Sequence, residues 1–231
     1  MTQRYRDGVN KGARVRRLVS GKKRTESSKR WLLRQLNDPY VARAKAEGFR
    51  SRAAFKLLEI DEKFHLFRPR QVVVDLGCAP GGWLQVVQRR VPQGRIIGVD
   101  LQEVAPMEGV TFLQGDFTEE TTVDQVLRSL GGQSVDIVLS DMAAMSCGLP
   151  KVDYLRIVTL VQAAADFASQ VLTPGGSFVA KVLRGGTPTE LLAELKRRFA
   201  KIDHVKPPAS RTDSAEMYIV ARGFRKGMSP S

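Results

Sequence analysis

The sequence predicts an α/β fold built on a mostly parallel β-sheet with helices on both faces. From residue 71 onward, short runs of β-branched and aliphatic residues alternate with longer segments of helical periodicity. Acidic residues also recur at the ends of successive predicted strands, where a parallel sheet gathers its ligands. A chain of 231 residues is long enough for one such domain with a substantial core.

Two helices are predicted before the sheet. Residues 27–48 are helical in pattern, with an interruption at Pro39. Residues 51–64, SRAAFKLLEIDEKF, predict a second helix with Ser51 as its N-cap and with Lys56 outside the apolar stripe. That stripe consists of Ala54, Leu57, Leu58 and Phe64.

Strands and helices then alternate to the end of the chain. The predicted strands are residues 71–76, 95–100, 110–116, 134–141, 176–183, 202–205 and 216–223. The predicted helices between them are residues 82–91, 118–130, 153–172 and 187–199. We expect the last strand to run antiparallel to the others, as final strands of such sheets often do.

A glycine-lined turn follows the first predicted strand, in the stretch VVVDLGCAPGGW of residues 72–83. Its glycines, at 77, 81 and 82, do not form the GxGxxG of a dinucleotide site, and no Gly-Lys-Ser/Thr follows as in a phosphate-binding loop. Cofactors that bind through phosphates are therefore less favoured than a nucleoside ligand without them.

Four aspartates lie at or near the ends of the first four predicted strands: Asp75, Asp100, Asp116 and Asp141. One such residue could cap a helix or form a turn, but four in succession indicate a lined pocket. Asp100 is placed to bind ribose hydroxyls and Asp116 to lie near an adenine. Because these acids suit a ligand with a cationic sulfonium and no phosphate, we expect S-adenosylmethionine as the cofactor.

Four charged residues indicate where chemistry could take place. Lys181 lies in an otherwise apolar strand, where an unpaired ammonium would be unfavourable, and Asp141 ends the neighbouring strand. If the last strand is antiparallel, Glu216 reaches the same rim, and Lys56 could complete the group. One lysine would then weaken the other's hold on its proton, so that it could act as a base. Separate surface salt bridges would leave the same pattern of charges.

The net charge of +13 predicts a polyanionic partner, either nucleic acid or anionic lipid. Residues 1–30 hold 11 Lys and Arg against two acidic residues, whereas residues 31–231 hold 26 against 22. We expect residues 1–27 to form a flexible basic arm that contacts RNA, followed by one domain over residues 28–231. A mitochondrial targeting segment and a merely solubilising tail are the alternatives.

The chain also excludes some classes of protein. No apolar run is long enough to cross a bilayer. The two cysteines, Cys78 and Cys147, lack the spacing of a zinc site, which predicts a reducing compartment and no structural metal. We expect a cytoplasmic monomer, with a mitochondrial location as the alternative.

Six segments resemble a known family in their order and spacing: SRAAFKLLEID, VVVDLGCAPGGW, GVTFLQGDF, VLSDMA, LTPGGSFVAKV and SAEMYIVA. They are similar to the FtsJ/RrmJ family of ribosomal RNA 2′-O-methyltransferases. The resemblance covers roughly residues 28 to 222, nearly all of the chain except the arm. It implies a Rossmann-like methyltransferase fold that uses S-adenosylmethionine, with a seven-stranded sheet.

The resemblance also implies a reaction and its residues. The family's Lys-Asp-Lys-Glu tetrad falls here on Lys56, Asp141, Lys181 and Glu216. The family's cofactor contacts fall on Gly81, Trp83, Asp100, Asp116 and Asp141. The implied activity is methyl transfer to the 2′-hydroxyl of a uridine ribose in 23S-type large-subunit ribosomal RNA, on an assembled or nearly assembled subunit and without a metal.

The chain departs from the family at one place. Ala144 and Met145 stand where the family usually has Pro-Asn, in a loop that borders the acceptor pocket. Sister families with the same tetrad modify transfer RNA or mRNA caps, and these remain alternative substrates. A ribosome-assembly factor that binds RNA without catalysis is the rival from another class, and binding of S-adenosylmethionine would distinguish it. A dehydrogenase is a more distant possibility, which failure to bind nicotinamide cofactors would exclude.

Overall fold

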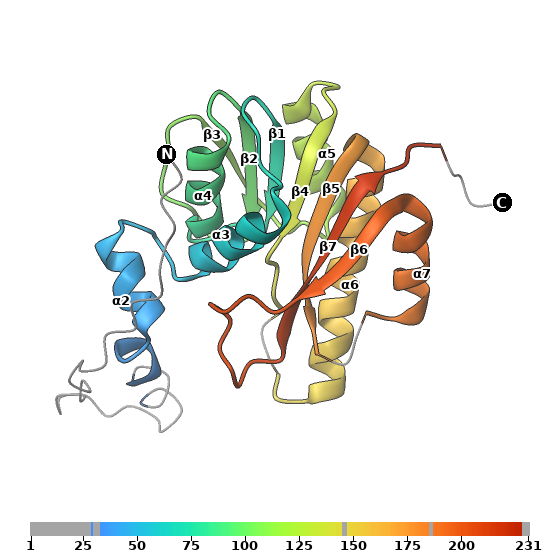
Figure 1. Ribbon diagram of the computed structural model, residues 1–231. Coiled ribbons are helices and arrows are strands. Elements are labelled where there is room, and N and C mark those ends of the chain that lie inside the picture. Colours follow the sequence, from blue (N-terminus) through green and yellow to red (C-terminus); the bar gives the residue numbers. More distant parts are fainter. Residues whose placement is uncertain (1–28, 30–32, 145–146, 185–186, 228–231) are drawn as a thin grey trace.

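Seven strands form one mixed sheet in the computed structural model, which describes residues 29, 33–144, 147–184 and 187–227. The predicted arm, residues 1–27, lies outside the described residues. The strand order is β3-β2-β1-β4-β5-β7-β6 (Figure 1). The strands are β1 (Val72–Leu76), β2 (Arg95–Asp100), β3 (Val110–Gln114), β4 (Val135–Ser140), β5 (Leu172–Leu183), β6 (Phe199–Val205) and β7 (Glu216–Phe224).

The direction of the strands confirms the predicted sheet. Strands β1 to β5 pair with one another in parallel. Strand β7 is antiparallel to both of its neighbours, β5 and β6. The last strand thus runs against the rest of the sheet, which brings its first residues to the edge where the parallel strands end.

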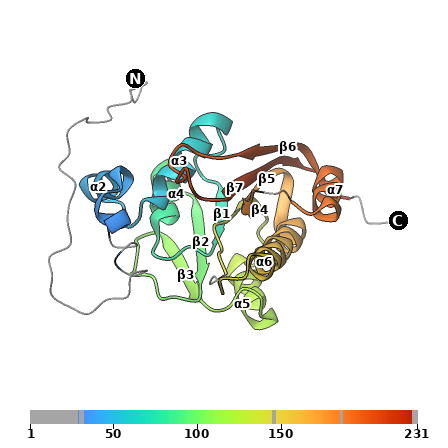
Figure 2. The same cartoon turned by 90° about the horizontal axis from the view of Figure 1, so that it is seen from below.

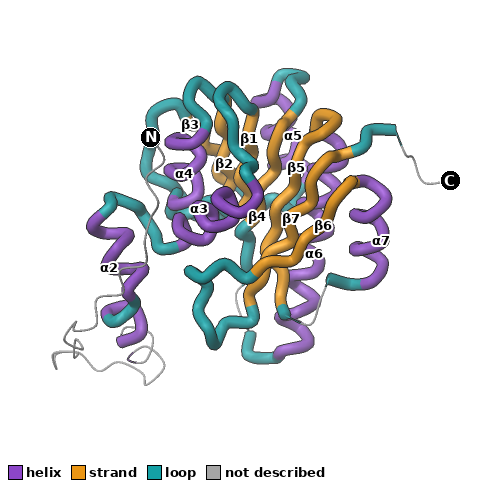
Figure 3. The backbone as a smooth tube through the Cα atoms, in the orientation of Figure 1, coloured by secondary structure: helices purple, strands orange, loops and turns teal. Residues whose placement is uncertain are grey.

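Helices cover both faces of the sheet. They are α2 (Pro39–Ala46), α3 (Ala53–Phe64), α4 (Gly82–Arg90), α5 (Glu120–Leu130), α6 (Pro150–Val171) and α7 (Thr189–Arg198). Helices α3 and α4 pack on one face and α5, α6 and α7 on the other, while α2 lies beside the sheet (Figures 2 and 3). No helix in the described part of the chain is long and apolar enough to span a membrane.

Each face of the sheet has its own hydrophobic core, and the strand period of two divides the residues between them. In β1, Val73 joins the core under α3 and α4, whereas Val72 and Val74 join the core under α5 and α6. Because β1 is central and covered on both faces, all five of its residues are buried.

The starts of the first two helices differ in how well the sequence predicted them. The interruption at Pro39 is confirmed, because Pro39 begins α2 behind Asp38, whose carboxylate caps the first turn. The prediction that Ser51 caps α3 is wrong. The helix begins at Ala53 with Arg52 in the N-cap position, and no side chain caps it. The Arg52 side chain instead turns toward Asp38, as described below.

Candidate active site

A cavity of about 720 Å³ opens at the carboxyl edge of the parallel strands. The loops after β1, β2, β3 and β4 form it together with α6. Three of the four strand-end aspartates, Asp100, Asp116 and Asp141, belong to its lining. The position of this cavity agrees with the rule that ligands of such sheets bind beyond the carboxyl ends of the strands.

Two of these carboxylates are held in place by hydrogen bonds from the cavity loops. Asp100 accepts from the backbone N–H of Ala79 and of Gln102, each at 2.8 Å, and so joins the end of β2 to the loop after β1. Asp116 accepts from the backbone N–H of Thr118 at 2.9 Å and from its hydroxyl at 2.7 Å. The two bonds from Thr118 lower the pKa of Asp116, so this carboxylate stays ionised at the cavity rim.

The glycine turn lets two cavity loops pass close to each other. Gly77 has a φ of +77°, and a Cβ atom on it would lie 2.8 Å from the backbone of Met142. Any larger residue would push the loop after β1 away from the loop after β4. Gly77 and Met142 both line the cavity, so this close approach shapes the pocket directly.

Asp75 does not line the cavity, contrary to the expectation from its position. Its exposed fraction is 0%, and neither carboxylate oxygen has a hydrogen-bond partner among the described residues. Burial raises the pKa of Asp75 well above its ordinary value, and the charges of Asp141 and Asp100 raise it further. The neutral acid is therefore favoured, because an isolated buried carboxylate is unfavourable.

The register between β5 and β7 builds the other half of the site. Lys181 lies directly opposite Tyr218, and Leu183 lies opposite Glu216. Because alternate residues of a strand share a face, Glu216 and Tyr218 both face α3. Lys56 projects toward them from α3 and is 8% exposed.

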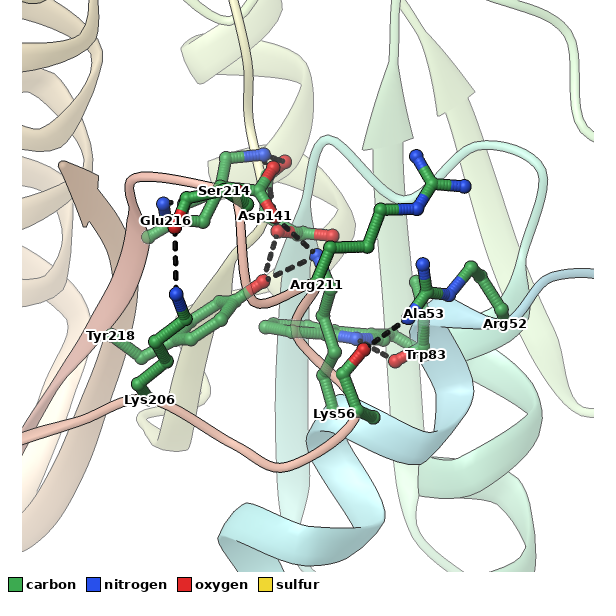
Figure 4. Close-up of polar contacts among 12 residues, drawn as sticks. Arg52, Ala53, Lys56, Trp83, Asp141, Lys206, Arg211, Ser214, Glu216 and Tyr218 are labelled. Atoms are coloured by element: carbon green, nitrogen blue, oxygen red, sulfur yellow. Dashed lines mark hydrogen bonds and ion pairs between the residues drawn. The ribbon is translucent and has the colours of Figure 1, made fainter. Parts of the chain in front are cut away.

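These side chains and Lys181 form a continuous series of contacts, which we call the polar chain: Glu216, Lys56, Tyr218, Asp141 and Lys181. Figure 4 labels the first four. The Lys56 ammonium is 3.0 Å from Glu216 Oε2 and donates to the Tyr218 hydroxyl at 3.1 Å. The Tyr218 hydroxyl donates to Asp141 Oδ1 at 2.8 Å. Lys181 Nζ lies 3.1 Å from the same Oδ1 and donates to the Asp141 carbonyl oxygen at 2.6 Å.

The structure thus brings the four predicted charged residues into one connected group, in which both lysines are buried, rather than into separate surface salt bridges. Lys181 is 5% exposed, so its ammonium depends on Asp141 for compensation. Lys56 is buried although it lies outside the predicted apolar stripe, because its ammonium finds polar partners on β7.

Tyr218 is the member of the polar chain that the sequence analysis missed. Burial raises its pKa well above the ordinary value, and the nearby charges of Asp141 and Glu216 raise it further. The phenol therefore stays protonated, which lets it accept from Lys56 and donate to Asp141 at once. Its position two residues after Glu216, on the same face of β7, is the signal that could have identified it.

The remaining predicted cofactor residues, Gly81 and Trp83, are not among the residues that line the cavity. Trp83 is 3% exposed and donates its indole N–H to the Ala53 carbonyl oxygen at 2.9 Å. Its ring packs against Tyr218, with 5.7 Å between the ring centroids. Gly81 faces Arg50, whose Nη1 atom would be 2.9 Å from an added Cβ. Cofactor contacts by Gly81 and Trp83 stay predictions.

The fold and the site define an α/β enzyme with a nucleoside-sized cavity beside buried lysines. The profile of the FtsJ-like methyltransferases matches residues 49–224, and the chain belongs to this family. A Novosphingobium aromaticivorans protein named ribosomal RNA large subunit methyltransferase E is 56% identical, covering 90% of this chain and 94% of that protein. A protein of the same name from Zymomonas mobilis is 54% identical, with coverage of 90% and 94%.

A solved structure supports the same assignment. The crystal structure of a Plasmodium falciparum protein described as a ribosomal RNA methyltransferase aligns with a TM-score of 0.70 and 30% identity. The alignment covers 78% of this chain and all of that one. The prediction of a Rossmann-like methyltransferase fold is therefore confirmed.

S-adenosylmethionine is the cofactor of this family, and the cavity fits it. Its volume of about 720 Å³ is in the range of small-ligand sites. Carboxylates at Asp100, Asp116 and Asp141 suit ribose hydroxyls and positive charge, and apolar side chains such as Leu101 and Leu160 suit a purine ring. The cofactor supplies a methyl group that its positive sulfur already activates.

Proposed function

We propose that this protein transfers a methyl group from S-adenosylmethionine to the 2′-hydroxyl of a uridine ribose in large-subunit ribosomal RNA. The observation that carries the proposal is the position of Lys181, whose Nζ lies 3.1 Å from an oxygen of Asp141. Asp141 also lines the cofactor cavity, so the Lys181 nitrogen lies beside the place proposed for the methyl group.

The proposed reaction divides its tasks among the residues of the polar chain. As the 2′-oxygen forms its bond to the methyl carbon, the carbon–sulfur bond breaks with its electron pair on sulfur. The hydroxyl proton passes to Lys181 Nζ, which must first lose the ammonium proton that pairs it with Asp141. Asp141 orients Lys181 through both its side chain and its carbonyl oxygen. Most of the rate acceleration comes from holding the oxygen in line with an already activated methyl group.

Lys56 and Glu216 serve the acceptor ribose in this proposal. They form the end of the polar chain away from Lys181, and the Glu216 side chain is 33% exposed, so it can be reached from outside. The two residues therefore can hydrogen-bond sugar hydroxyls while remaining paired with each other. Tyr218 connects them to Asp141 and keeps both halves of the chain in one arrangement.

The substrate assignment draws its support from the relatives named for large-subunit ribosomal RNA methylation. The net charge of +13 agrees with a substrate made of RNA, and most of it lies in residues 1–30. We further propose an assembled or nearly assembled large subunit as the substrate, with the enzyme acting as a cytoplasmic monomer. Residues 1–27 would add phosphate contacts.

The test uses large ribosomal subunits from a strain that lacks this gene. The purified protein and S-adenosylmethionine with a labelled methyl group should label the large-subunit RNA, and mass spectrometry should find the label on the 2′-oxygen of one uridine. Labelling of transfer RNA or of capped mRNA instead would favour a sister substrate. Binding of the subunit with neither cofactor binding nor transfer would support an assembly factor without catalysis.

A further inference from the structure

A buried carboxylate outside the polar chain connects the two segments that carry Lys56 and Glu216. We propose that Asp38, just before α2, is a positioning residue for the acceptor half of the active site. It would fix α3 against the segment that leads into β7, and thereby place Lys56 relative to Glu216. This inference rests on the proposed function of the polar chain.

Asp38 accepts hydrogen bonds from two arginines that are far apart in the sequence. Its Oδ2 atom is 2.6 Å from Arg52 Nη1 and 3.2 Å from both Nε and Nη2 of Arg211. The Asp38 side chain is 6% exposed, and those of Arg52 and Arg211 are 15% and 26% exposed. A carboxylate this well shielded interacts with its arginines more strongly than a surface pair would.

Each arginine lies close to one member of the polar chain. Arg52 precedes Lys56 by one helical turn of α3. Arg211 lies in the segment of residues 206–215 between β6 and β7, just before Glu216. Figure 4 draws both arginines with Lys56 and Glu216. Asp38 therefore fixes the two backbones that carry this pair.

Further bonds secure the same segment to α3. Arg52 also donates to the carbonyl oxygen of Ala209. Glu59, one turn beyond Lys56 on α3, accepts from the backbone N–H of Ala209 at 2.7 Å and from the hydroxyl of Tyr40 at 3.2 Å. Tyr40 and Asp38 are both at the start of α2, so this start contacts α3 through Glu59 and Arg52 and contacts the segment through Arg211.

Hydrogen bonds within the segment of residues 206–215 connect it to Glu216. Lys206 donates to the carbonyl oxygens of Thr212 and Ser214 at 3.1 and 2.7 Å, which closes the loop on itself. The Ser214 hydroxyl accepts from the backbone N–H of Glu216 at 3.1 Å. Arg211 is thus joined to Glu216 through Ser214, whose backbone N–H donates to the Arg211 carbonyl oxygen at 3.1 Å.

The pair of Lys56 and Glu216 needs such support. The two residues are 160 positions apart, and a single contact of 3.0 Å joins their side chains. With the Glu216 side chain one-third exposed, this ion pair alone does little to fix two backbones. A displacement of about 1 Å can lower a rate about a hundredfold when the reaction depends on alignment.

Asp38→Asn is the variant that tests the proposal. Asparagine is as good an N-cap as aspartate, so α2 keeps its start, while the charge that holds the two arginines is lost. Asp203→Asn is the matched control, because it removes a carboxylate 2.8 Å from Arg222 on the outer strands, away from the polar chain. Both variants are compared with wild type in single-turnover methyl transfer to large ribosomal subunits.

We expect Asp38→Asn to lower the transfer rate about 10- to 100-fold while leaving the dissociation constant of S-adenosylmethionine within twofold of wild type. The control should transfer at the wild-type rate. Arg211→Gln should show a defect of the same kind, and combining it with Asp38→Asn should add little, because Asp38→Asn already breaks the contact with Arg211.

Other outcomes overturn the inference. A wild-type rate in Asp38→Asn would do so, and so would an equal loss in the control. A loss of cofactor binding in Asp38→Asn that matches its loss of transfer would show general damage rather than misplacement. If wild type itself transfers no methyl group to the ribosomal subunit, the proposed function fails, and that result is separate from these comparisons.

Discussion

Replacement of Lys181 tests the proposed proton acceptor most directly. Lys181→Met keeps the length of the side chain but removes the ammonium that contacts both Oδ1 and the carbonyl oxygen of Asp141. Asp141 would keep the hydroxyl of Tyr218 as a partner, and its side chain is 17% exposed. Because breaking a buried ion pair generally costs about 3 to 5 kcal/mol, we expect a loss of about 2 to 3 kcal/mol in the free energy of unfolding.

The expected effect on transfer is larger than the effect on stability. Loss of a general base that also positions the acceptor should lower the single-turnover rate about a hundredfold or more, which corresponds to at least about 2.7 kcal/mol in the activation free energy. Lys181→Arg should fail nearly as badly, because a guanidinium keeps the charge but cannot give up its proton. Binding of S-adenosylmethionine and of the ribosomal subunit should be largely unchanged.

The assay is methyl transfer at saturating enzyme and cofactor, with thermal unfolding of each variant measured in parallel. Lys201→Met and Lys201→Arg, at an exposed position on β6, provide the matched controls and should behave as wild type. Near-normal transfer by Lys181→Arg would show that Lys181 acts through charge and orientation alone. The general-base role would then be wrong, although the site would stand.

Three further predictions concern other parts of the chain. Asp100→Ala should weaken S-adenosylmethionine binding by about 1 to 3 kcal/mol in calorimetry, because the ribose hydroxyls lose an acceptor and the bonds to Ala79 and Gln102 are lost as well. An unchanged dissociation constant would contradict the assignment of Asp100 to the cofactor. Asp75 has a folded-state pKa above its ordinary value of 3.8, so its contribution to stability is full below that pH and is lost as pH rises through the folded-state pKa. The melting temperature of Asp75→Asn should therefore rise relative to that of wild type as pH increases from about 5 to 8. Parallel plots of melting temperature against pH for the two proteins would refute this reasoning. Deletion of residues 1–27 should flatten the plot of log affinity for RNA against log salt and leave cofactor binding unchanged; an identical slope would mean that these residues do not contact the RNA.

The strands and the strand-end acids could be predicted because they depend on local pattern. A run of β-branched residues followed by an acid and a turn identifies a buried parallel strand and its carboxyl end, as at Asp100 and Asp141. The same rule was wrong for the role of Asp75, which pairs with Gly98 on one side and Leu139 on the other. Its place inside a central strand, rather than at the rim, depends on the order of the strands.

Local pattern could place Tyr218 on the same face of β7 as Glu216, but its contact with Asp141 depends on a register between distant segments. Its hydroxyl meets Asp141 only because β7 runs antiparallel to β5 and places Tyr218 opposite Lys181. The start of α3 was missed for a related reason. Ser51 is a good cap by residue type, but the contacts of Arg52 with Asp38 and with residue 209 fix the chain one residue further on.

Asp141 connects the two halves of the proposed mechanism. It belongs both to the lining of the cofactor cavity and to the polar chain. Among the described residues, no other member of the polar chain lines the cavity. Its carbonyl oxygen and its Oδ1 atom both contact Lys181, so the lysine is fixed partly by backbone that no substitution at position 141 removes. The Asp141 carboxylate therefore sets the charge around Lys181, while the backbone at the end of β4 fixes the position of the Lys181 ammonium. In the proposed mechanism, a methyl group held in the cavity and a hydroxyl held at Lys181 would therefore meet beside Asp141.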